Sequence, residues 1–314
     1  MPDPPRSLEE LSLAEKRQLL AKLLQEKSER RAWCPLSQGQ RGLWLLHRTN
    51  PLGAAYNLSF PTRLRSRMNV AAFRQALQTL VDRHASLRTT YLERDGELWQ
   101  RVHEKVPVAF EACDVPSASD AWIKSRLEEE MQRPFDLECG PLLRTFLFTR
   151  DADDHLFLAV AHHIVLDFWS LIVMLMEVRE TYAAACDGRQ ASLPPVGSSY
   201  FDFVRWQSSV LAGKQGETLA EYWERRLSGV PHVLELPTDL PRPAVFTYRA
   251  GDVRCHVARD ATSGLLNLAA EERATLYAVL LAAFQVLLSR HSGQTDFAIG
   301  TPFAGRSRSE FDNT

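Results

Sequence analysis

An uninterrupted apolar run that ends in a cluster of polar residues is the strongest constraint on how this chain can fold. Residues 155–161 contain neither proline nor glycine and have the length and composition of a buried strand. His162, His163 and Asp167 follow closely, and residues 171–185 are then apolar at helical spacing. The pattern predicts a buried strand that passes through a short turn into a helix. Such a turn can present side chains to a cavity while the elements on either side stay rigid.

The two adjacent imidazoles admit a catalytic, a metal-binding or a purely structural interpretation. Neutral imidazole is a natural general base near neutral pH, and neighbours on a strand point to opposite faces, so one of the pair would face a cleft. A histidine in an apolar run is most often a satisfied core residue, so the residues alone favour a structural role over catalysis. A metal site would use His162 or His163 with Asp167. No metal is expected, because no third ligand follows at a recognisable spacing and the motif lacks a glutamate.

Composition excludes several classes of function. The 314 residues are 45% hydrophobic, enough for a large core and about two domains. A formal net charge of −2 gives no electrostatic case for binding nucleic acid or an anionic membrane. The five cysteines are isolated and form no CxxC pair, which is typical of reduced thiols in a cytoplasmic protein. The longest apolar block, residues 276–288, is too short to span a bilayer and predicts a buried helix that ends at Gly293.

Residues 1–34 form a separate N-terminal segment. Ser12 and Glu15 have the spacing of a capping box, and leucines follow at helical spacing among charged residues. The segment predicts one short amphipathic helix. We interpret it as a linker packed on the following domain, with docking to another polypeptide as the alternative.

The rest of the chain alternates helical and strand patterns. Residues 35–230 predict an N-terminal lobe, and residues 231–314 predict a partial C-terminal lobe that begins in a proline-rich irregular stretch. Within the second lobe, strands are expected at residues 252–257 and 296–299, on either side of two helices. Mixed elements in this order predict an α/β sandwich with layered packing.

Five separate motifs occur in an order that matches a known family. Residues 35–44 are similar to an SxxQxRxW motif, residues 83–91 to RHxxLRTxF, residues 162–167 to HHxxxD, residues 200–206 to YxDFxxW and residues 299–306 to GTPxAGR. On these motifs the chain resembles the condensation domain of nonribosomal peptide synthetases, within the HHxxxD acyltransferase superfamily. Each motif alone is weak, but five in sequence across most of the chain are highly specific.

The resemblance implies a two-lobed α/β sandwich, similar to chloramphenicol acetyltransferase, with the active site in a tunnel between the lobes. Donor and acceptor carrier proteins would each present a thioester on a phosphopantetheine arm. The acceptor's amine would attack the donor's acyl or peptidyl thioester and form an amide. No cofactor is expected on the enzyme itself, because the phosphopantetheine belongs to the carriers. Adjacent synthetase domains are the other expected partners, and the expected location is the cytoplasm.

The resemblance also assigns roles within the HHxxxD motif. His163 is the expected catalytic residue, which either removes a proton from the attacking amine or holds the amine and stabilises the tetrahedral species. His162 would support the turn from the opposite face. Asp167 would pair with an arginine from an early strand and thereby fix the loop, with Arg63 as the first candidate and Arg65 as the second.

Further residues are expected near the substrate or in supporting positions. The residues expected beside the tunnel or the substrate are Phe168, Trp169, Ser170, Gly300 and Thr301. Those expected to support the fold are Arg83, His84, Arg88, Tyr200 and Trp206.

The sequence departs from the family pattern at two places. Phe168 replaces the usual glycine after the motif's aspartate, and the Asp-Phe-Trp-Ser form is similar to condensation domains of hybrid polyketide–peptide assembly lines. This variant implies a polyketide acyl donor. The chain also stops at Thr314, before a further family motif would be expected. We therefore expect the second lobe to be incomplete, and we do not expect these residues alone to be fully active.

Other functions on the same fold stay open. An epimerisation domain carries the same motif, although the residues that follow its aspartate usually differ. A heterocyclisation domain is less compatible, because it replaces the histidine pair with aspartates. A catalytically silent platform that only docks carrier proteins is the alternative from a different class.

Overall fold

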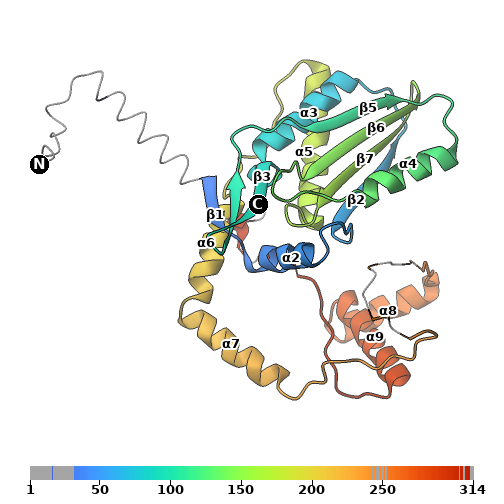
Figure 1. Cartoon of the computed structure of the whole chain (residues 1–314). Helices are drawn as coiled ribbons and strands as arrows, with labels where there is room; N and C mark the ends of the chain where they lie inside the picture. The colour runs from blue at the N-terminus through green and yellow to red at the C-terminus, as the bar shows by residue number, and fades with distance from the viewer. Residues whose placement is uncertain are drawn as a thin grey trace, which may run out of the picture. The chain divides into compact units, whose positions relative to one another are not determined.

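A computed structural model describes Lys16 and residues 32–311, apart from residues 242, 245–247, 249–250, 252, 304 and 307 (Figure 1). The amphipathic helix expected from the capping box at Ser12 lies outside the described residues. Contacts divide the chain into two units. The first comprises Met1–Gly213 together with Ala304–Thr314, and the second comprises Lys214–Phe303.

Two sheets form the framework of the first unit. The larger sheet has the order β2-β7-β6-β5, made of β2 (Asn57–Leu64), β7 (Asp154–His162), β6 (Leu143–Asp151) and β5 (Ala109–Asp114). The smaller sheet has the order β1-β4-β3, made of β1 (Trp33–Pro35), β4 (Glu97–Val102) and β3 (Thr89–Arg94). All pairings are antiparallel except that of β5 with β6. Pro61 is tolerated in β2 because that strand lies at the edge of its sheet, where a missing N–H breaks no ladder.

The apolar run of residues 155–161 lies within the interior strand β7. Ala161 pairs with Leu58 on one side and with Leu143 on the other, so both neighbours fix the end of the strand. Leu158 and Val160 are completely buried. The predicted strand and the helix that follows it are confirmed, and the turn between them therefore starts from a buried strand that is hydrogen-bonded on both sides.

The helices of the first unit begin at the residues that their capping patterns indicate. They are α2 (Gln38–Thr49), α3 (Val70–Arg83), α4 (Asp120–Gln132), α5 (Phe168–Asp187) and α6 (Tyr200–Leu211), with the short 3₁₀ helices η1 (Ala85–Arg88) and η2 (Ser309–Phe311). The side chains of Ser37, Asn69 and Asp167 cap α2, α3 and α5. Helices α3 and α5 pack against each other and against one face of the larger sheet (Figure 1).

The second unit contains α7 (Lys214–Leu227), α8 (Arg259–Glu271) and α9 (Leu276–Ser292). Helix α9 ends at Gly293, which has a φ of 73°, as the sequence predicted. Its expected burial is wrong, because none of its described residues is buried and Leu280, Phe284 and Leu287 are 47–50% exposed. The described residues of the two predicted strands, 253–257 and 296–299, are irregular, since no described neighbour in this unit supplies their hydrogen bonds.

The boundary between the units differs from the expected position at residue 231. Helix α7 groups with the second unit, whereas the chain from residue 304 returns to the first. The reason is packing, because the Phe311 ring lies 5.5 Å from that of Phe203 and 5.6 Å from that of Trp206 in α6. Among the described helices none is alone both long and apolar enough to cross a membrane. Helices α8 and α9 meet that test only as a pair, across a bend of 108°.

Candidate active site

Backbone and side-chain hydrogen bonds stabilise the turn between β7 and α5. The His162 N–H donates to the Leu142 carbonyl at 3.1 Å, and the His163 N–H donates to the Tyr56 carbonyl at 2.8 Å. The Ile164 N–H donates to His162 Nδ1 at 3.1 Å, which requires that this nitrogen carry a lone pair. The ring of His162 is buried. His162 therefore stabilises the turn from within the protein.

Burial is the main cause of a lowered pKa at His162, about 4, and the neighbouring His47 and His163 lower it further. The ring thus stays neutral in the fold but protonates near its ordinary value of 6.5 in the unfolded chain. We expect the free energy of unfolding to be fully maintained above pH 6.5 and to fall by about 3 kcal/mol as the pH drops toward 4. Denaturant titrations at several pH values measure this slope.

The control for this prediction is His162→Gln, which keeps His47 and His163 and removes the buried imidazole. The variant is expected to be less stable than the wild type at pH 7 and to lose less stability on acidification. Parallel pH curves for the two proteins would contradict the assignment.

His163 points the other way and is exposed. Its Nδ1 lies 2.9 Å from the Leu166 carbonyl oxygen, an atom that can only accept a hydrogen bond. Nδ1 therefore carries the proton, and in the neutral ring Nε2 carries the lone pair. His163 lines a pocket that is open to solvent, together with Asp167, Ser170, Tyr200 and Arg306. The turn thus fixes the tautomer that a general base needs.

Asp167 begins helix α5 and is held by several hydrogen bonds. Its Oδ1 accepts from the Ser170 N–H at 2.7 Å and from the Ser170 hydroxyl at 2.6 Å. Arg306 donates to both carboxylate oxygens, at 2.7 Å and 3.1 Å, and to the Ser170 hydroxyl at 3.1 Å. Burial raises the pKa of Asp167, but the hydrogen bonds from Arg306 and Ser170 outweigh it and hold the pKa below its usual value. Asp167 is therefore an ionised cap.

The expected partner of Asp167 is wrong. Arg63 forms a bidentate ion pair with Asp154, with two N–O distances of 2.7 Å. Arg63 lies opposite Leu156 in the register of β2 and β7, about 20 Å along the strand from His162. Its side chain meets a carboxylate at the far end of β7, and Arg306 takes the role expected of Arg63 or Arg65. Arg306 is the last residue of the GTPxAGR-like motif, so the sequence did contain a signal for it.

Removing the Asp167 carboxylate is expected to destabilise the protein moderately. In Asp167→Ala, the lost helix cap costs about 1 kcal/mol. The lost ion pair costs about 1 kcal/mol more, because the Asp167 side chain is 37% exposed and water screens the pair. Chemical denaturation of Asp167→Ala, Arg306→Ala and the double variant should give a coupling energy of about 1 kcal/mol. The same cycle with Arg63→Ala should give none, and a coupling with Arg63 as large as that with Arg306 would refute the correction.

A buried polar network supports the turn from the side of the smaller sheet. Gln40 Nε2 donates to the Tyr91 hydroxyl at 3.0 Å, and that hydroxyl donates to the Ile164 carbonyl at 3.2 Å. Gln100 Nε2 donates to Gln40 Oε1 at 3.2 Å. All three side chains are almost completely buried. The network connects the first, second and third sequence motifs, although Gln100 lies outside every motif and gave no signal.

Two side chains of the second motif, Arg83 and His84, bind α5 through Glu177. Arg83 Nε donates to Glu177 Oε1 at 2.9 Å, and His84 Nε2 lies 2.6 Å from Glu177 Oε2. Arg88 donates to backbone carbonyls, including that of Val81 at 3.0 Å. The sequence did not single out Glu177, which occurs among the polar residues of an otherwise apolar helix. Its partners show that it is an internal anchor.

The remaining predicted residues lie in different environments. Phe168 and Trp169, in the first turn of α5, are 73% and 46% exposed. Gly300 and Thr301 belong to the second unit, and their position beside a substrate stays a prediction. Across the described part of the chain, His, Cys, Asp and Glu residues do not gather in groups of three that could hold a metal ion.

Comparison with known proteins gives a consistent result. The model of the condensation domain family matches residues 31–314. The chain is 38% identical over 283 residues to one component of the linear gramicidin synthase of Brevibacillus parabrevis, a match that covers 89% of this chain. It is 40% identical over 288 residues to another component of the same synthase, covering 90% of this chain. The chain spans only 4% and 6% of the length of these relatives.

A solved structure shows the same arrangement of elements. A four-domain nonribosomal peptide synthetase, crystallised with AMP and glycine, matches with a TM-score of 0.78 and 26% identity. The match covers 90% of this chain and 21% of that one. The similarity therefore extends over both units of the chain.

Proposed function

The chain belongs to the condensation domain family, and from that premise we propose that it joins a carrier-bound acyl or peptidyl thioester to a carrier-bound aminoacyl amine. The amine nitrogen bonds to the thioester carbonyl carbon, and the carbon–sulfur bond then breaks. One amine proton is lost, and the donor thiol gains a proton. The products are an amide on the acceptor carrier and a free phosphopantetheine thiol on the donor carrier.

One observation carries this proposal, namely the hydrogen bond from His163 Nδ1 to the Leu166 carbonyl at 2.9 Å. It leaves Nε2 of the neutral ring with a lone pair at the surface of the pocket. His163 then either takes the proton from the attacking amine or holds that amine while the tetrahedral species forms. Asp167 is a positioning residue, since Arg306 and Ser170 already occupy its carboxylate.

The partners follow from the same chemistry. The substrates would arrive on donor and acceptor carrier proteins, and neighbouring synthetase domains would supply or receive those carriers. The multidomain nature of a structural relative supports this arrangement. A cytoplasmic location is compatible with the five cysteines, all of which are free thiols in the structure.

The donor is proposed to be a polyketide acyl group. Phe168 stands where the family usually has glycine, directly after the Asp167 cap, and it is exposed. A bulky apolar side chain at position 168 would favour a donor that has no peptide amide next to it, because an amide against an apolar ring lacks a hydrogen-bond partner. Peptidyl and polyketide thioesters supplied side by side to the full-length protein test this, and a clear preference for the peptidyl donor refutes it.

The test of the function is a reaction of the full-length protein with a loaded donor carrier and a loaded acceptor carrier, followed by mass spectrometry. Amide product supports condensation. Exchange of deuterium into the acceptor's α-carbon without amide formation would indicate epimerisation. Binding of carriers without either reaction would indicate a docking platform.

A further inference from the structure

Tyr200 lines the same pocket as His163, and the reaction described so far does not use its hydroxyl. Tyr200 is the first residue of α6, and its ring stacks on that of Phe203 with the ring centroids 5.4 Å apart. Its hydroxyl lies 2.9 Å from the hydroxyl of Ser37, the residue directly before α2. Contacts with two separate elements therefore hold the Tyr200 hydroxyl in place.

The surroundings of Ser37 decide which of the two hydroxyls donates. Ser37 is 2% exposed, so bulk water does not accept its proton. The Ser37 oxygen already accepts from the Gln40 N–H at 3.2 Å, which leaves the hydroxyl proton as the atom that needs a partner. Tyr200 Oη is the one side-chain or backbone acceptor for it among the described residues. Ser37 therefore donates to Tyr200.

This direction leaves the proton of the Tyr200 hydroxyl available to a molecule in the pocket. Ser37 is the only hydrogen-bond partner of that hydroxyl in the part of the chain that the structure describes. Burial is the largest influence on the pKa of Tyr200 and raises it above the ordinary value of 10, so the hydroxyl keeps its proton near neutral pH. The pKa also responds to the charges of Asp167 and Arg306, which line the same pocket. The hydroxyl end of the ring is therefore the end near the pocket.

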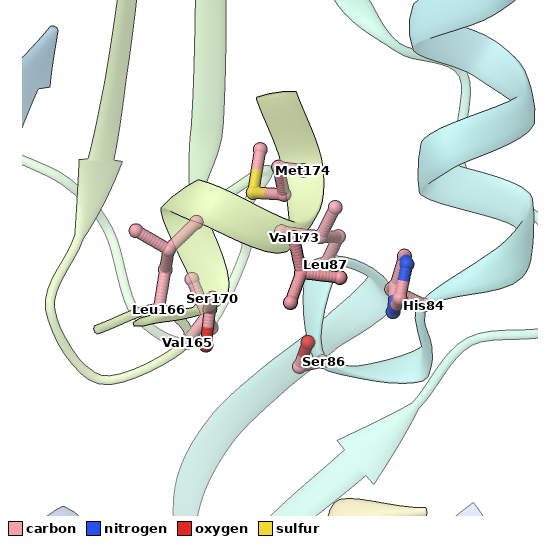
Figure 2. A pocket seen from close by; sticks show the side chains of 8 residues that line it. All are labelled: His84, Ser86, Leu87, Val165, Leu166, Ser170, Val173 and Met174. Carbon is pink, nitrogen blue, oxygen red and sulfur yellow. The ribbon is translucent and has the colours of Figure 1, made fainter. Parts of the chain in front are cut away.

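The other side-chain donors of this pocket are either engaged or not oriented. Four of them already donate within the protein, namely His163 Nδ1, Gln40 Nε2, the Ser170 hydroxyl and the Arg306 guanidinium. Ser86 is the remaining one. It lies on η1, on the side of the space opposite Ser170 of α5 (Figure 2). Its hydroxyl makes no hydrogen bond to any described residue, so no neighbour fixes the direction of its proton. Tyr200 is thus the oriented donor of the pocket.

We propose that the Tyr200 hydroxyl is a catalytic hydrogen-bond donor to the carbonyl oxygen of the donor thioester. The inference rests on the proposed function. As the amine nitrogen bonds to the carbonyl carbon, the π electron pair of the carbonyl moves onto its oxygen, and Tyr200 donates a hydrogen bond to that developing charge. The carbonyl re-forms when sulfur leaves with the electron pair of the carbon–sulfur bond and gains the proton that the amine has lost. Tyr200 keeps its own proton throughout.

Tyr200→Phe removes the oxygen and keeps the ring on Phe203. With loaded carriers and the full-length protein, kcat should fall about 100-fold. KM should change by less than about twofold, because the hydrogen bond strengthens only as charge develops on the oxygen. Tyr182→Phe is the matched control, since the Tyr182 hydroxyl accepts from the Asn69 N–H at 3.0 Å but is not part of the pocket. It should keep the wild-type kinetics.

Two outcomes of these rate measurements would overturn the proposal. One is an unchanged kcat in Tyr200→Phe. The other is a loss in Ser86→Ala that exceeds the loss in Tyr200→Phe, because the unoriented hydroxyl would then be the donor.

A dithioester donor tests where the Tyr200 hydroxyl acts. Sulfur in place of the carbonyl oxygen is a weak hydrogen-bond acceptor, so with this donor Tyr200→Phe should lower kcat by no more than about threefold. A purely structural role of Tyr200 would lower kcat equally with both donors, and that result would also reject the proposal.

A binding measurement separates this inference from the proposed function. Pantetheine methylphosphonate, whose tetrahedral anionic group imitates the intermediate, can be titrated into the full-length protein by calorimetry whether or not amide forms. Tyr200→Phe should weaken its binding at least about tenfold, and Tyr182→Phe should leave it unchanged. That result without any amide formation would support the oxyanion donor and count against condensation. Amide formation by the wild type, with kcat and phosphonate binding both independent of Tyr200, would retain the function and reject the donor.

Discussion

Replacing His163 with alanine is expected to lower kcat/KM for amide formation by about 100- to 10,000-fold, the usual contribution of a positioned general base. The melting temperature should stay close to that of the wild type. The side chain is exposed, and its hydrogen bond to Leu166 is the contact that the substitution removes. The backbone hydrogen bond from His163 to Tyr56 remains. Rates from loaded carriers and a thermal denaturation curve provide the two measurements.

His163→Asn separates the chemical role from the structural one. The asparagine amide can still donate to the Leu166 carbonyl, but it has no nitrogen that accepts a proton near neutral pH. If this variant is as inactive as His163→Ala, the ring nitrogen is required. If it recovers most of the activity, the residue serves to shape the turn. Amide formation at near wild-type rates by the alanine variant would exclude His163 from the reaction.

Glu177→Ala is expected to give the largest loss of stability. The Glu177 side chain is 8% exposed, and those of its partners Arg83 and His84 are 19% and 13% exposed. Removal of the carboxylate leaves the largely buried Arg83 guanidinium without its ion pair, which costs about 3 kcal/mol in free energy of unfolding, the lower end of the range for a buried pair. Denaturant titration at neutral pH measures it.

Glu180→Ala on the same helix is the matched control for this prediction. Glu180 also pairs with an arginine, Arg189, but both side chains are far more exposed, at 30% and 42%. Glu180→Ala should therefore lower the free energy of unfolding only slightly. Equal losses for the two variants would show that Glu177 is not an internal anchor.

The sequence was a reliable guide where local pattern decides the structure. An apolar run without helix breakers and a helical repeat after it indicated β7 and α5, because the spacing of apolar residues shows which element can bury them. It failed at Asp167, whose partner Arg306 lies 139 residues further along the chain. Several arginines could have satisfied that carboxylate, and only the fold shows that Arg63 ends beside Asp154. Glu177 was missed for a related reason, since a glutamate on a helix has the same pattern whether it faces solvent or an ion pair.

The strands expected at residues 252–257 and 296–299 show a second limit. A strand is stable only with a hydrogen-bonded neighbour, so alternation of residue types is necessary but not sufficient. The described residues of both stretches are irregular. By contrast, the side chains of Ser37, Asn69 and Asp167 cap α2, α3 and α5 through residues at most three positions away, so these contacts depend on local sequence alone.

The chain returns to the first unit through Arg306, which binds Asp167, and through Phe311, which packs on α6. This returning segment acts as a ligand that is covalently tethered to its own binding site. The chain leaves that unit at Gly213 and comes back at Ala304, so covalent continuity sets the local concentration of this ligand. A protease cut anywhere between residues 214 and 303 would convert it into a separate peptide. The fraction of molecules in which Arg306 is paired with Asp167 would then fall as the protein is diluted.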